Sequence, residues 1–269
     1  MPDRDKPLES QKYVESLMKG LEILDSLQGR AQMTLTEIAS ELGMYKSRVM
    51  RLCGTLERMG YVVFDGPSRV YSLGPRIPAL ARVYEDTNPI LAVARPTLER
   101  LFKEIRQSVA FHKIHDKGLI CVIRLSRGVA NHDQEPVWRE RDLHCGARGR
   151  VMLAFSSDEF RENFFAISER YPALTPFTIT TREKLASEVE KTRRMGYALT
   201  SEERELGRVG IAAPVFQYSN DLVGVISISG DINEFGKPSR KKAIRMLLDE
   251  TAKLSSRLGA DKGGDAAKD

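Results

Sequence analysis

The sequence has few cysteines and no long hydrophobic run. Its 269 residues include three cysteines, Cys53, Cys121 and Cys145, which are widely spaced and form no CxxC pair. This argues against a disulfide framework or a zinc site. No apolar run approaches the roughly 18 residues that span a bilayer, and the start, MPDRDKP, lacks the apolar segment of a signal peptide. We therefore expect a cytoplasmic protein without a metal or other cofactor, in which Cys53 is a small core residue.

The basic charge is unevenly distributed along the chain. The net charge is +5, but residues 1–75 hold ten Lys or Arg and ten Asp or Glu. Between residues 45 and 69, five basic residues face two acidic ones, a local balance of +3. DNA affinity depends on which side chains reach phosphates, so a neutral domain with a basic face is compatible with DNA binding. The length suits two domains, and no internal repeat or low-complexity tract is evident.

Residues 34–71 predict a winged helix-turn-helix. Thr34 and Glu37 have the spacing of a capping box, which marks a helix start. Gly43 then permits a sharp turn. Apolar residues recur at helical spacing before it, at Leu35, Ile38, Ala39 and Leu42, and after it, at Val49, Leu52, Leu56 and Met59. Gly60 ends the second helix, and residues 61–64 and 70–73 predict a hairpin around a turn at 65–67.

The second helix presents an outer face suited to B-DNA. A helix fits the major groove, guanidinium groups can donate two hydrogen bonds to guanine, and flanking Lys and Arg contact phosphates. The helical period places Ser47, Met50, Arg51, Gly54 and Arg58 on this face, with Lys46 and Arg48 beside it. The predicted DNA contacts are Thr34, Tyr45, Lys46, Ser47, Arg48, Met50, Arg51 and Arg69. The alternative is a structural winged helix that touches protein or RNA.

The remaining periodicity divides the chain into further segments. Apolar residues from Val14 to Leu27 predict a helix that packs under the helix-turn-helix. We expect a DNA-binding domain over residues 11–74, a linker helix over 75–87, and a second domain over 88–258. The polar ends, residues 1–10 and 259–269, are expected to be flexible tails.

The second domain mixes strands and helices. A hairpin is predicted over 109–114 and 119–125, followed by a loop or edge strand over 126–142. Helices are predicted from about His144 to Phe155, from Asp158, and from Thr181 to Gly196. Strands follow at 197–200, 208–215 and 223–229, and a last helix runs from Pro238 to Leu258. The pattern predicts an α+β domain with a mostly antiparallel sheet.

Several motifs in this order resemble the IclR family of bacterial transcriptional regulators. They are KGLEILDSL, LTEIASELGMYKSRVMRL, MGYVVFD, YSLGPRI, LHCGARGRVMLAF, KTRRMGYALTSEERELGRVGIAAPVF and VGVISISG, and the resemblance covers about Tyr13 to Leu258. It implies an N-terminal winged helix, a linker helix, and a C-terminal effector-binding domain of GAF-like or profilin-like shape. It also implies homodimers, often paired into homotetramers, that bind double-stranded operator DNA.

Strand alternation and the resemblance indicate the same effector site. Ser227 and Ser229 share a strand face with Val223 and Val225, while Arg208 and Gly210 lie opposite Val209 and Ile211. Buried hydroxyls require partners. In the family's small-acid sensors, a carboxylate is held by backbone before the central helix and by serines of the last strand. Carried over, the predicted ligand-binding residues are Ala147, Arg148, Ser227 and Ser229, with Thr200, Arg208 and Gly210 lining the remainder.

The sequence departs from the family pattern at three arginines. Arg148 stands where a small residue is usual, Arg208 where an apolar one is usual, and Arg150 where Lys is common. A guanidinium fork and a helix N-terminus both suit carboxylates, so we expect a small organic acid effector, aromatic or dicarboxylic. The alternatives are that Arg148 or Arg208 pairs with Glu202, Glu203 or Glu205, and that the serines bond backbone or water.

Two other functions are compatible with parts of the sequence. GAF-like domains can host thiol chemistry, with Cys121 or Cys145 as nucleophile, but the sequence shows no base and orienting group near them beyond the adjacent His144. The second is a DNA architectural protein without a ligand. We therefore predict a ligand-responsive DNA-binding regulator of catabolic genes that is not an enzyme.

Overall fold

The computed structural model describes residues 13–27, 30–115, 118–126, 137–138 and 143–260. Contacts divide the chain between Asn88 and Pro89 into two compact units, each described by itself below. The predicted tails lie outside the described residues, apart from residues 259–260. Residues 11–12 of the predicted first domain and most of the segment 126–142 lie outside them as well.

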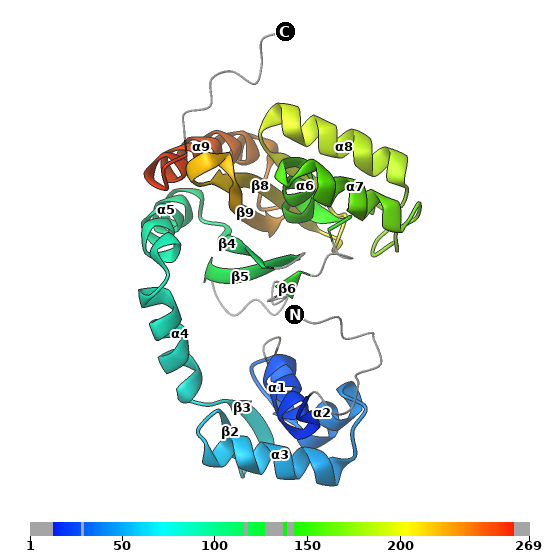
Figure 1. The fold of residues 1–269 in the computed structure, drawn as a ribbon, viewed down its shortest axis with the longest axis vertical. Helices are drawn as coiled ribbons and strands as arrows, with labels where there is room; N and C mark the ends of the chain where they lie inside the picture. The colour runs from blue at the N-terminus through cyan, green and yellow to red at the C-terminus, as the bar shows by residue number, and fades with distance from the viewer. Residues whose placement is uncertain (1–12, 28–29, 116–117, 127–136, 139–142, 261–269) are drawn as a thin grey trace. The chain divides into compact units, whose positions relative to one another are not determined.

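The N-terminal unit is a winged helix-turn-helix (Figure 1). Its helices are α1 (Glu15–Leu27), α2 (Leu35–Glu41), α3 (Lys46–Arg58) and α4 (Arg76–Asp86). Its strands β1 (Met33–Thr34), β2 (Val62–Asp65) and β3 (Val70–Leu73) form an antiparallel sheet in the order β1-β3-β2. The hairpin matches the expectation, but the short strand β1, which pairs Met33 with Tyr71, was not expected.

The predicted start and turn of the helix-turn-helix are confirmed. The Thr34 backbone N–H donates to Glu37 Oε2 over 2.7 Å, and the Glu37 N–H donates back to the Thr34 hydroxyl. These two bonds satisfy backbone donors that the first turn of α2 leaves without helical partners. Gly43 adopts φ +60°, which a residue with a side chain rarely adopts, and this lets the chain turn from α2 into α3.

Some predicted inward-facing residues are on the surface. The core of the unit contains Val49 and Cys53 of α3 with Ile23 and Leu27 of α1. The predicted inward position of Met59 is wrong, because α3 ends at Arg58 and Met59 is 51% exposed. Similarly, Val14, just before α1, and Leu17 and Leu21 within it are exposed, so only part of the predicted apolar pattern packs against the unit.

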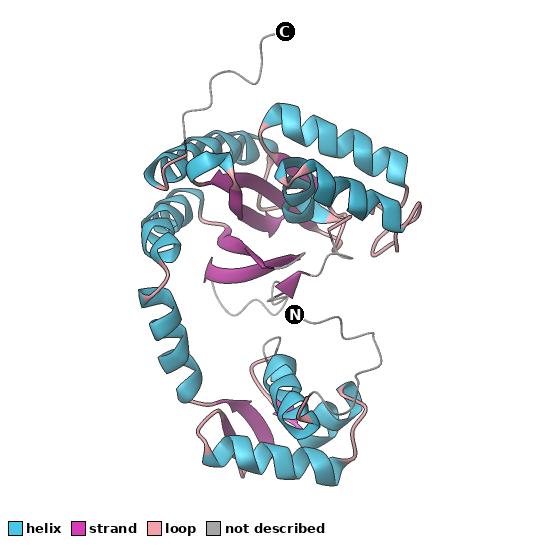
Figure 2. Ribbon diagram, viewed as in Figure 1, coloured by secondary structure: helices cyan, strands magenta, loops and turns pink. Residues whose placement is uncertain are grey.

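The C-terminal unit has an antiparallel six-stranded sheet in the order β6-β5-β4-β9-β8-β7, with helices on both faces (Figure 2). The strands are β4 (Ser108–His115), β5 (Gly118–Leu125), β6 (Val137–Trp138), β7 (Ala198–Ser201), β8 (Arg208–Phe216) and β9 (Leu222–Asp231). The helices are α5 (Pro89–Ile105), α6 (Gly146–Phe155), α7 (Asp158–Ile167), α8 (Arg182–Met195) and α9 (Lys237–Arg257), with a short 3-10 turn η3 (Tyr218–Asn220). The fold class is α+β, as predicted.

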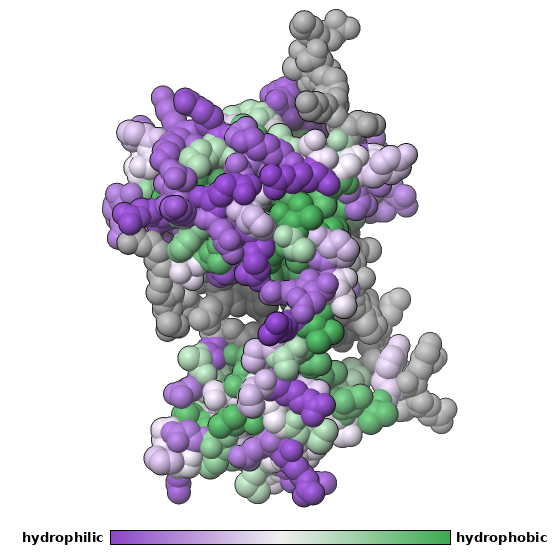
Figure 3. Space-filling view, turned by 90° about the vertical axis from the view of Figure 1, so that its left-hand side faces the viewer, coloured by the Kyte–Doolittle hydropathy of each residue, from purple (hydrophilic) through white to green (hydrophobic). Residues whose placement is uncertain are grey.

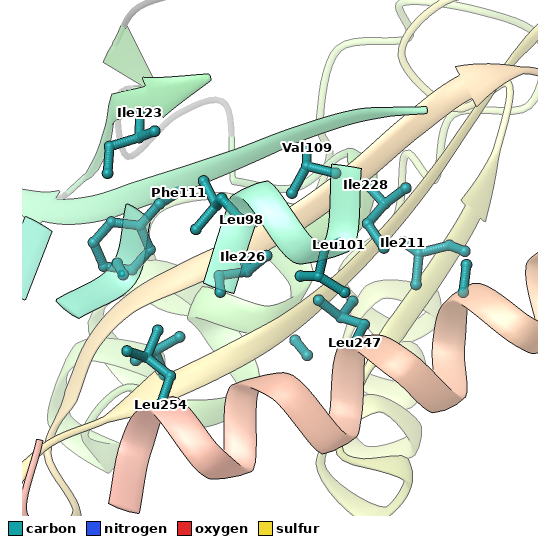
Figure 4. Close-up of a cluster of buried hydrophobic side chains, with 14 of the residues drawn as sticks. Leu98, Leu101, Val109, Phe111, Ile123, Ile211, Ile226, Ile228, Leu247 and Leu254 are labelled. Atoms are coloured by element: carbon teal, nitrogen blue, oxygen red, sulfur yellow. The ribbon is translucent and has the colours of Figure 1, made fainter. Parts of the chain in front are cut away.

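Each face of the sheet has its own hydrophobic core. Helices α5 and α9 cover one face, where Leu98, Leu101 and Leu247 pack on Phe111 and Ile228 (Figure 4). Helix α6 lies on the other face, with α8 packed against it. Alternation places Val209 and Ile211 in the first core, and Val225 and Ala212 in the second.

One strand position deviates from this alternation. Val215 pairs with Gly224 and Phe216 with Leu222, so Val223 is an extra residue in a β-bulge. It therefore packs against the first core instead of sharing the face of Val225, which corrects the expectation for Val223. The bulge lies before Ser227 and Ser229, so these two serines keep the same face as each other.

Candidate functional site

The outer face of α3 is exposed and basic. Lys46, Ser47, Met50 and Arg51 are all exposed, and Met50 is 56% exposed although it is apolar. Tyr45 precedes the helix as its N-cap residue without a side-chain cap bond and is 85% exposed. These five residues form one accessible surface at the N-terminal half of α3. Such a surface can offer donors and apolar contacts to base edges and cations to phosphates.

Three of the predicted DNA contacts have particular local settings. The Thr34 hydroxyl is bonded to Glu37 in the capping box. Arg48 donates to Glu15 Oε1 over 2.8 Å, which ties α3 to α1, but the two side chains are still 42% and 70% exposed. An exposed pair of this kind contributes little stability, so phosphate can compete for Arg48. Arg69 lies in the turn between β2 and β3 with φ 55°, at the exposed tip of the wing.

The predicted ligand-binding residues of the C-terminal unit gather under the N-terminus of α6. Thr200, Gly210 and Ser229 are direct neighbours across β7, β8 and β9. A Cβ at Gly210 would lie 3.2 Å from the Thr200 hydroxyl oxygen and 3.7 Å from the Ala147 Cβ. Ala147 and Arg148 lie in the first turn of α6, whose backbone N–H groups lack helical partners and favour an anion. The fold thus brings a hydroxyl row close to an anion-favouring helix end.

His112 connects two of the predicted residues, Ser227 and Arg148. Its Nε2 atom lies 2.9 Å from the Ser227 hydroxyl and 3.4 Å from Arg148 Nη1. His112 is completely buried. Burial lowers the pKa of His112 well below its usual value, and the nearby guanidinium groups of Arg148 and Arg124 lower it further. The imidazole is therefore neutral near pH 7.

Arg124, a neighbour of His112, is not among the ligand-binding residues that the sequence predicted. Arg124 pairs with Ala110 in the β4–β5 ladder, while Phe111 and Ile123, one position along, pack in the core on the other face. Arg124 therefore shares the α6 face with Ala110. The signal that could have found it is a charged residue within the otherwise apolar strand LICVIRL.

Glu203 binds a different arginine from those considered in the sequence. Both of its carboxylate oxygens accept from Arg150 Nη2, over 2.6 and 2.8 Å, and Oε2 also accepts from the Gly146 backbone N–H. Arg150 Nη1 lies 3.6 Å from Glu188 of α8. The expected alternative, in which Arg148 or Arg208 pairs with Glu203, is therefore wrong, because Arg150 is the partner of Glu203. Glu203 thus accepts from the first backbone N–H of α6, that of Gly146. The next two backbone N–H groups of the first turn are those of Ala147 and Arg148.

Arg208 lies at the outer end of this site. It is the first residue of β8, two positions before Gly210, and it pairs in register with Asp231. The Arg208 carbonyl accepts from the Glu202 N–H over 2.7 Å, while Glu202 Oε1 accepts from the Gly207 N–H. Of the predicted ligand-binding residues, Arg208 is therefore the most peripheral.

Cys145, one of the two cysteines considered as a nucleophile, lies at the start of α6 with its sulfur near an arginine. Cys145 is buried at the N-cap of α6, with Arg204 Nη1 3.6 Å from its sulfur. His144 directs Nε2 to the Pro172 carbonyl and stacks on Tyr171. Among the described residues, no cluster of His, Cys, Asp or Glu could hold a metal ion, and no described helix is long and apolar enough to cross a membrane.

Comparisons with known proteins match both units. Residues 16–66 match the family described as IclR helix-turn-helix domain, and residues 83–256 match Bacterial transcriptional regulator IclR C-terminal. The HTH-type transcriptional regulator KipR of Bacillus subtilis is 26% identical, over 91% of this chain and 97% of its own.

Solved structures share the fold. An IclR transcriptional regulator from Alicyclobacillus acidocaldarius is 27% identical with a TM-score of 0.74, covering 91% of this chain and 98% of that one. An IclR homologue from Microbacterium hydrocarbonoxydans, in complex with 4-hydroxybenzoate, has 19% identity and a TM-score of 0.67, covering 91% of this chain and all of that one (100%).

Proposed function

Because the chain belongs to the IclR family of bacterial transcriptional regulators, we propose that it controls catabolic genes by binding an operator through α3 and the wing and by sensing a small organic acid. It is a DNA-binding transcriptional regulator with a C-terminal ligand-binding domain, and it is not an enzyme. We further propose that its DNA target is an operator, that its effector is a small organic acid, and that it acts in the cytoplasm, where that DNA lies.

The observation that carries the DNA-binding proposal is the exposed basic face of α3. Lys46, Ser47 and Arg51 project from the N-terminal half of a helix that begins directly after a tight turn. In helix-turn-helix proteins this half of the second helix meets base edges in the major groove. Tyr45, Arg48, Met50 and, from the wing, Arg69 complete the proposed surface, while Thr34 contributes at the start of α2.

The proposed effector site lies between the α6 N-terminus and the sheet. Ala147 and Arg148 would offer backbone donors to a carboxylate, and the Arg148 guanidinium would be a further donor. Ser227, Ser229 and Thr200 would offer hydroxyls, while Gly210 leaves space beside them and Arg208 lies at the edge. Helix N-termini and guanidinium groups both favour anions. We propose an aromatic or dicarboxylic acid. The Microbacterium homologue, which was solved in complex with 4-hydroxybenzoate, supports the aromatic alternative.

Replacing Arg148 or Ser229 with alanine should weaken acid binding about tenfold or more, since a hydrogen bond to a charged group contributes roughly 1.5–3 kcal/mol. A thermal-shift screen of organic acids on the full chain would find an effector, because binding to the folded state alone raises apparent stability. Calorimetry with that effector then measures the affinity of each variant.

Operator affinity without effector is the control for these variants, and it should not change. If both variants keep the affinity of the intact protein for a confirmed effector, the two residues do not belong to the site. A screen in which no organic acid stabilises the protein would instead contradict the acid-sensing proposal itself.

We also propose that the regulator is a homodimer or a homotetramer. In the N-terminal unit, α4 has no buried residue, and Leu80, Val83 and Tyr84 are exposed on one side of it. Leu17 and Leu21 of α1, with Val14 just before it, form a similar exposed stripe. Figure 3 shows hydrophobic patches breaking up the hydrophilic surface of this unit. Contiguous exposed apolar residues mark interaction surfaces, and a second copy of the chain would cover them.

Replacing both Leu17 and Val83 with glutamate should shift the protein toward monomers, because carboxylates would oppose burial of these faces. Sedimentation velocity measures the distribution of species at several concentrations. Tyr218, which is 75% exposed in the C-terminal unit, provides the control, and Tyr218→Glu should leave the distribution unchanged. An unchanged distribution in the double variant would exclude these faces from the subunit contact.

A further inference from the structure

The tautomer of His112 follows from its contacts. Arginine has only hydrogen-bond donors, so the His112 Nε2 atom, 3.4 Å from Arg148 Nη1, must be the unprotonated acceptor. The Ser227 hydroxyl, 2.9 Å away, can donate to the same atom. Since the ring is neutral, its proton is on Nδ1. Among the described residues, this buried Nδ1 has no hydrogen-bond partner.

A buried donor without an acceptor costs free energy, and such violations are concentrated at functional sites. The donor lies in a ring already connected to Ser227 and Arg148, two residues of the proposed effector site. A ligand oxygen that accepts from Nδ1 would remove this cost. The proposed effector site therefore has two polar ends. The first end is the α6 N-terminus with the hydroxyl row of Thr200 and Ser229, and the second end is His112.

Positive charge surrounds this second end. Arg148 approaches His112 from α6, and Arg124 approaches from β5, on the face that Ala110 shares. Both guanidinium groups are close enough to disfavour a positive charge on His112. Planar guanidinium groups suit carboxylates, because two N–H donors can meet the two oxygens. An anionic oxygen group on the ligand fits this end better than a neutral one.

The two ends are separated by a distance that a small molecule can span. Ser227 and Ser229 are two residues apart on β9, which corresponds to about 7 Å along a strand. His112 is bonded to Ser227 and pairs in register with Val225. It therefore lies farther along the sheet from the hydroxyl row of Thr200 and Ser229 than Ser227 does. Between the ends, Ala110 contributes only a methyl group to the sheet face. A ligand with an apolar middle and an anion at each end matches this pattern.

We propose that the effector is a dicarboxylate, and that His112 with Arg124 and Arg148 determines specificity by recognising its second carboxylate. This proposal rests on the proposed acid-sensing function and narrows its ligand class. The first carboxylate binds at the α6 N-terminus with Ser229 and Thr200. The second accepts from His112 Nδ1 after a small adjustment of the ring, and it pairs with the two guanidinium groups.

The test compares matched acids by calorimetry on the full-length protein. Adipate is compared with hexanoate, and terephthalate with benzoate, since each pair differs by one carboxylate. At least one dicarboxylate should bind about tenfold or more tightly than its partner. His112→Leu should bring that ratio close to one, and His112→Gln, which keeps an acceptor and a donor, should restore part of it. Arg124→Met should lower the ratio independently, in case the buried His112→Leu variant folds poorly.

His115 provides the matched control, because it is an exposed histidine on the same strand, and His115→Asn should leave the ratio unchanged. If both monocarboxylates bind at least as tightly as the dicarboxylates, or if neither His112→Leu nor Arg124→Met lowers the ratio, the dicarboxylate proposal is wrong while acid sensing stands. Tighter binding of 4-hydroxybenzoate than of terephthalate would equally overturn it. If none of these or other organic acids binds, acid sensing fails as well.

Discussion

Replacing Glu203 with alanine should lower the free energy of unfolding of the C-terminal unit by about 3–5 kcal/mol, the usual cost of breaking a buried ion pair by removing one partner. Arg150 is 2% exposed and Glu203 9% exposed, so alanine at position 203 would leave a buried guanidinium without its main partner. The Gly146 N–H would also lose its acceptor. Urea denaturation followed by circular dichroism measures the change.

The control for this prediction removes both charges together. Arg150→Met combined with Glu203→Leu keeps apolar volume and should recover much of the lost stability, because no uncompensated charge remains buried. The double variant would still leave the Gly146 N–H without its acceptor, so its stability should stay below that of the intact protein. A single Glu203→Ala variant as stable as the intact protein would show that solvent reaches Arg150.

Replacing Arg51 with alanine should weaken specific operator binding by about 1–3 kcal/mol, or roughly fivefold to 150-fold, if its guanidinium reads a base. Arg51 is exposed in the middle of the outer face of α3, one turn after Lys46 and Ser47. A bidentate contact to guanine would be lost without any structural cost, since Arg51 lies outside the core of the unit. Gel-shift titration on the operator and on scrambled DNA measures both affinity and sequence preference.

Two other residues distinguish base reading from general charge. Arg58 is also exposed but lies at the last turn of α3, away from the end expected to enter the groove, so Arg58→Ala should have a much smaller effect. Lys46→Ala should weaken binding to all sequences alike and reduce the salt dependence by about one phosphate contact. If Arg51→Ala behaves like Lys46→Ala, Arg51 contacts phosphate and reads no base.

Local sequence signals predicted most of the elements because their causes are local. The Thr34–Glu37 capping box, the turn at Gly43 and the helical spacing from Val49 to Leu56 each act within a few residues. Alternation along β8 correctly separated Gly210 from Val209 and Ile211. Alternation placed Val223 on the wrong face, because a β-bulge shifts the pairing of β9 with β8 at this point. The residues of β9 alone give no sign of the bulge.

Apolar periodicity identifies residues that share a helix face, but it does not show what covers that face. Leu17 and Leu21 of α1 follow the same spacing as Ile23 and Leu27, yet the first two are exposed and the last two are buried. Met59 continued the stripe of α3 in the sequence but lies beyond the end of the helix. Burial is a property of packing between elements, so sequence spacing alone could not distinguish these residues.

By itself, the sequence determined the α+β class, the winged helix-turn-helix, the outer face of α3 and the strand face that carries Ser227 and Ser229. Only the tertiary structure decided that Arg150, and neither Arg148 nor Arg208, binds Glu203, and that His112 joins Ser227 to Arg148. These partners are distant in the sequence. They meet because β9 pairs with β4 and because α6 lies over the sheet, and such side-chain pairings depend on strand order and helix placement, which short-range spacing does not encode.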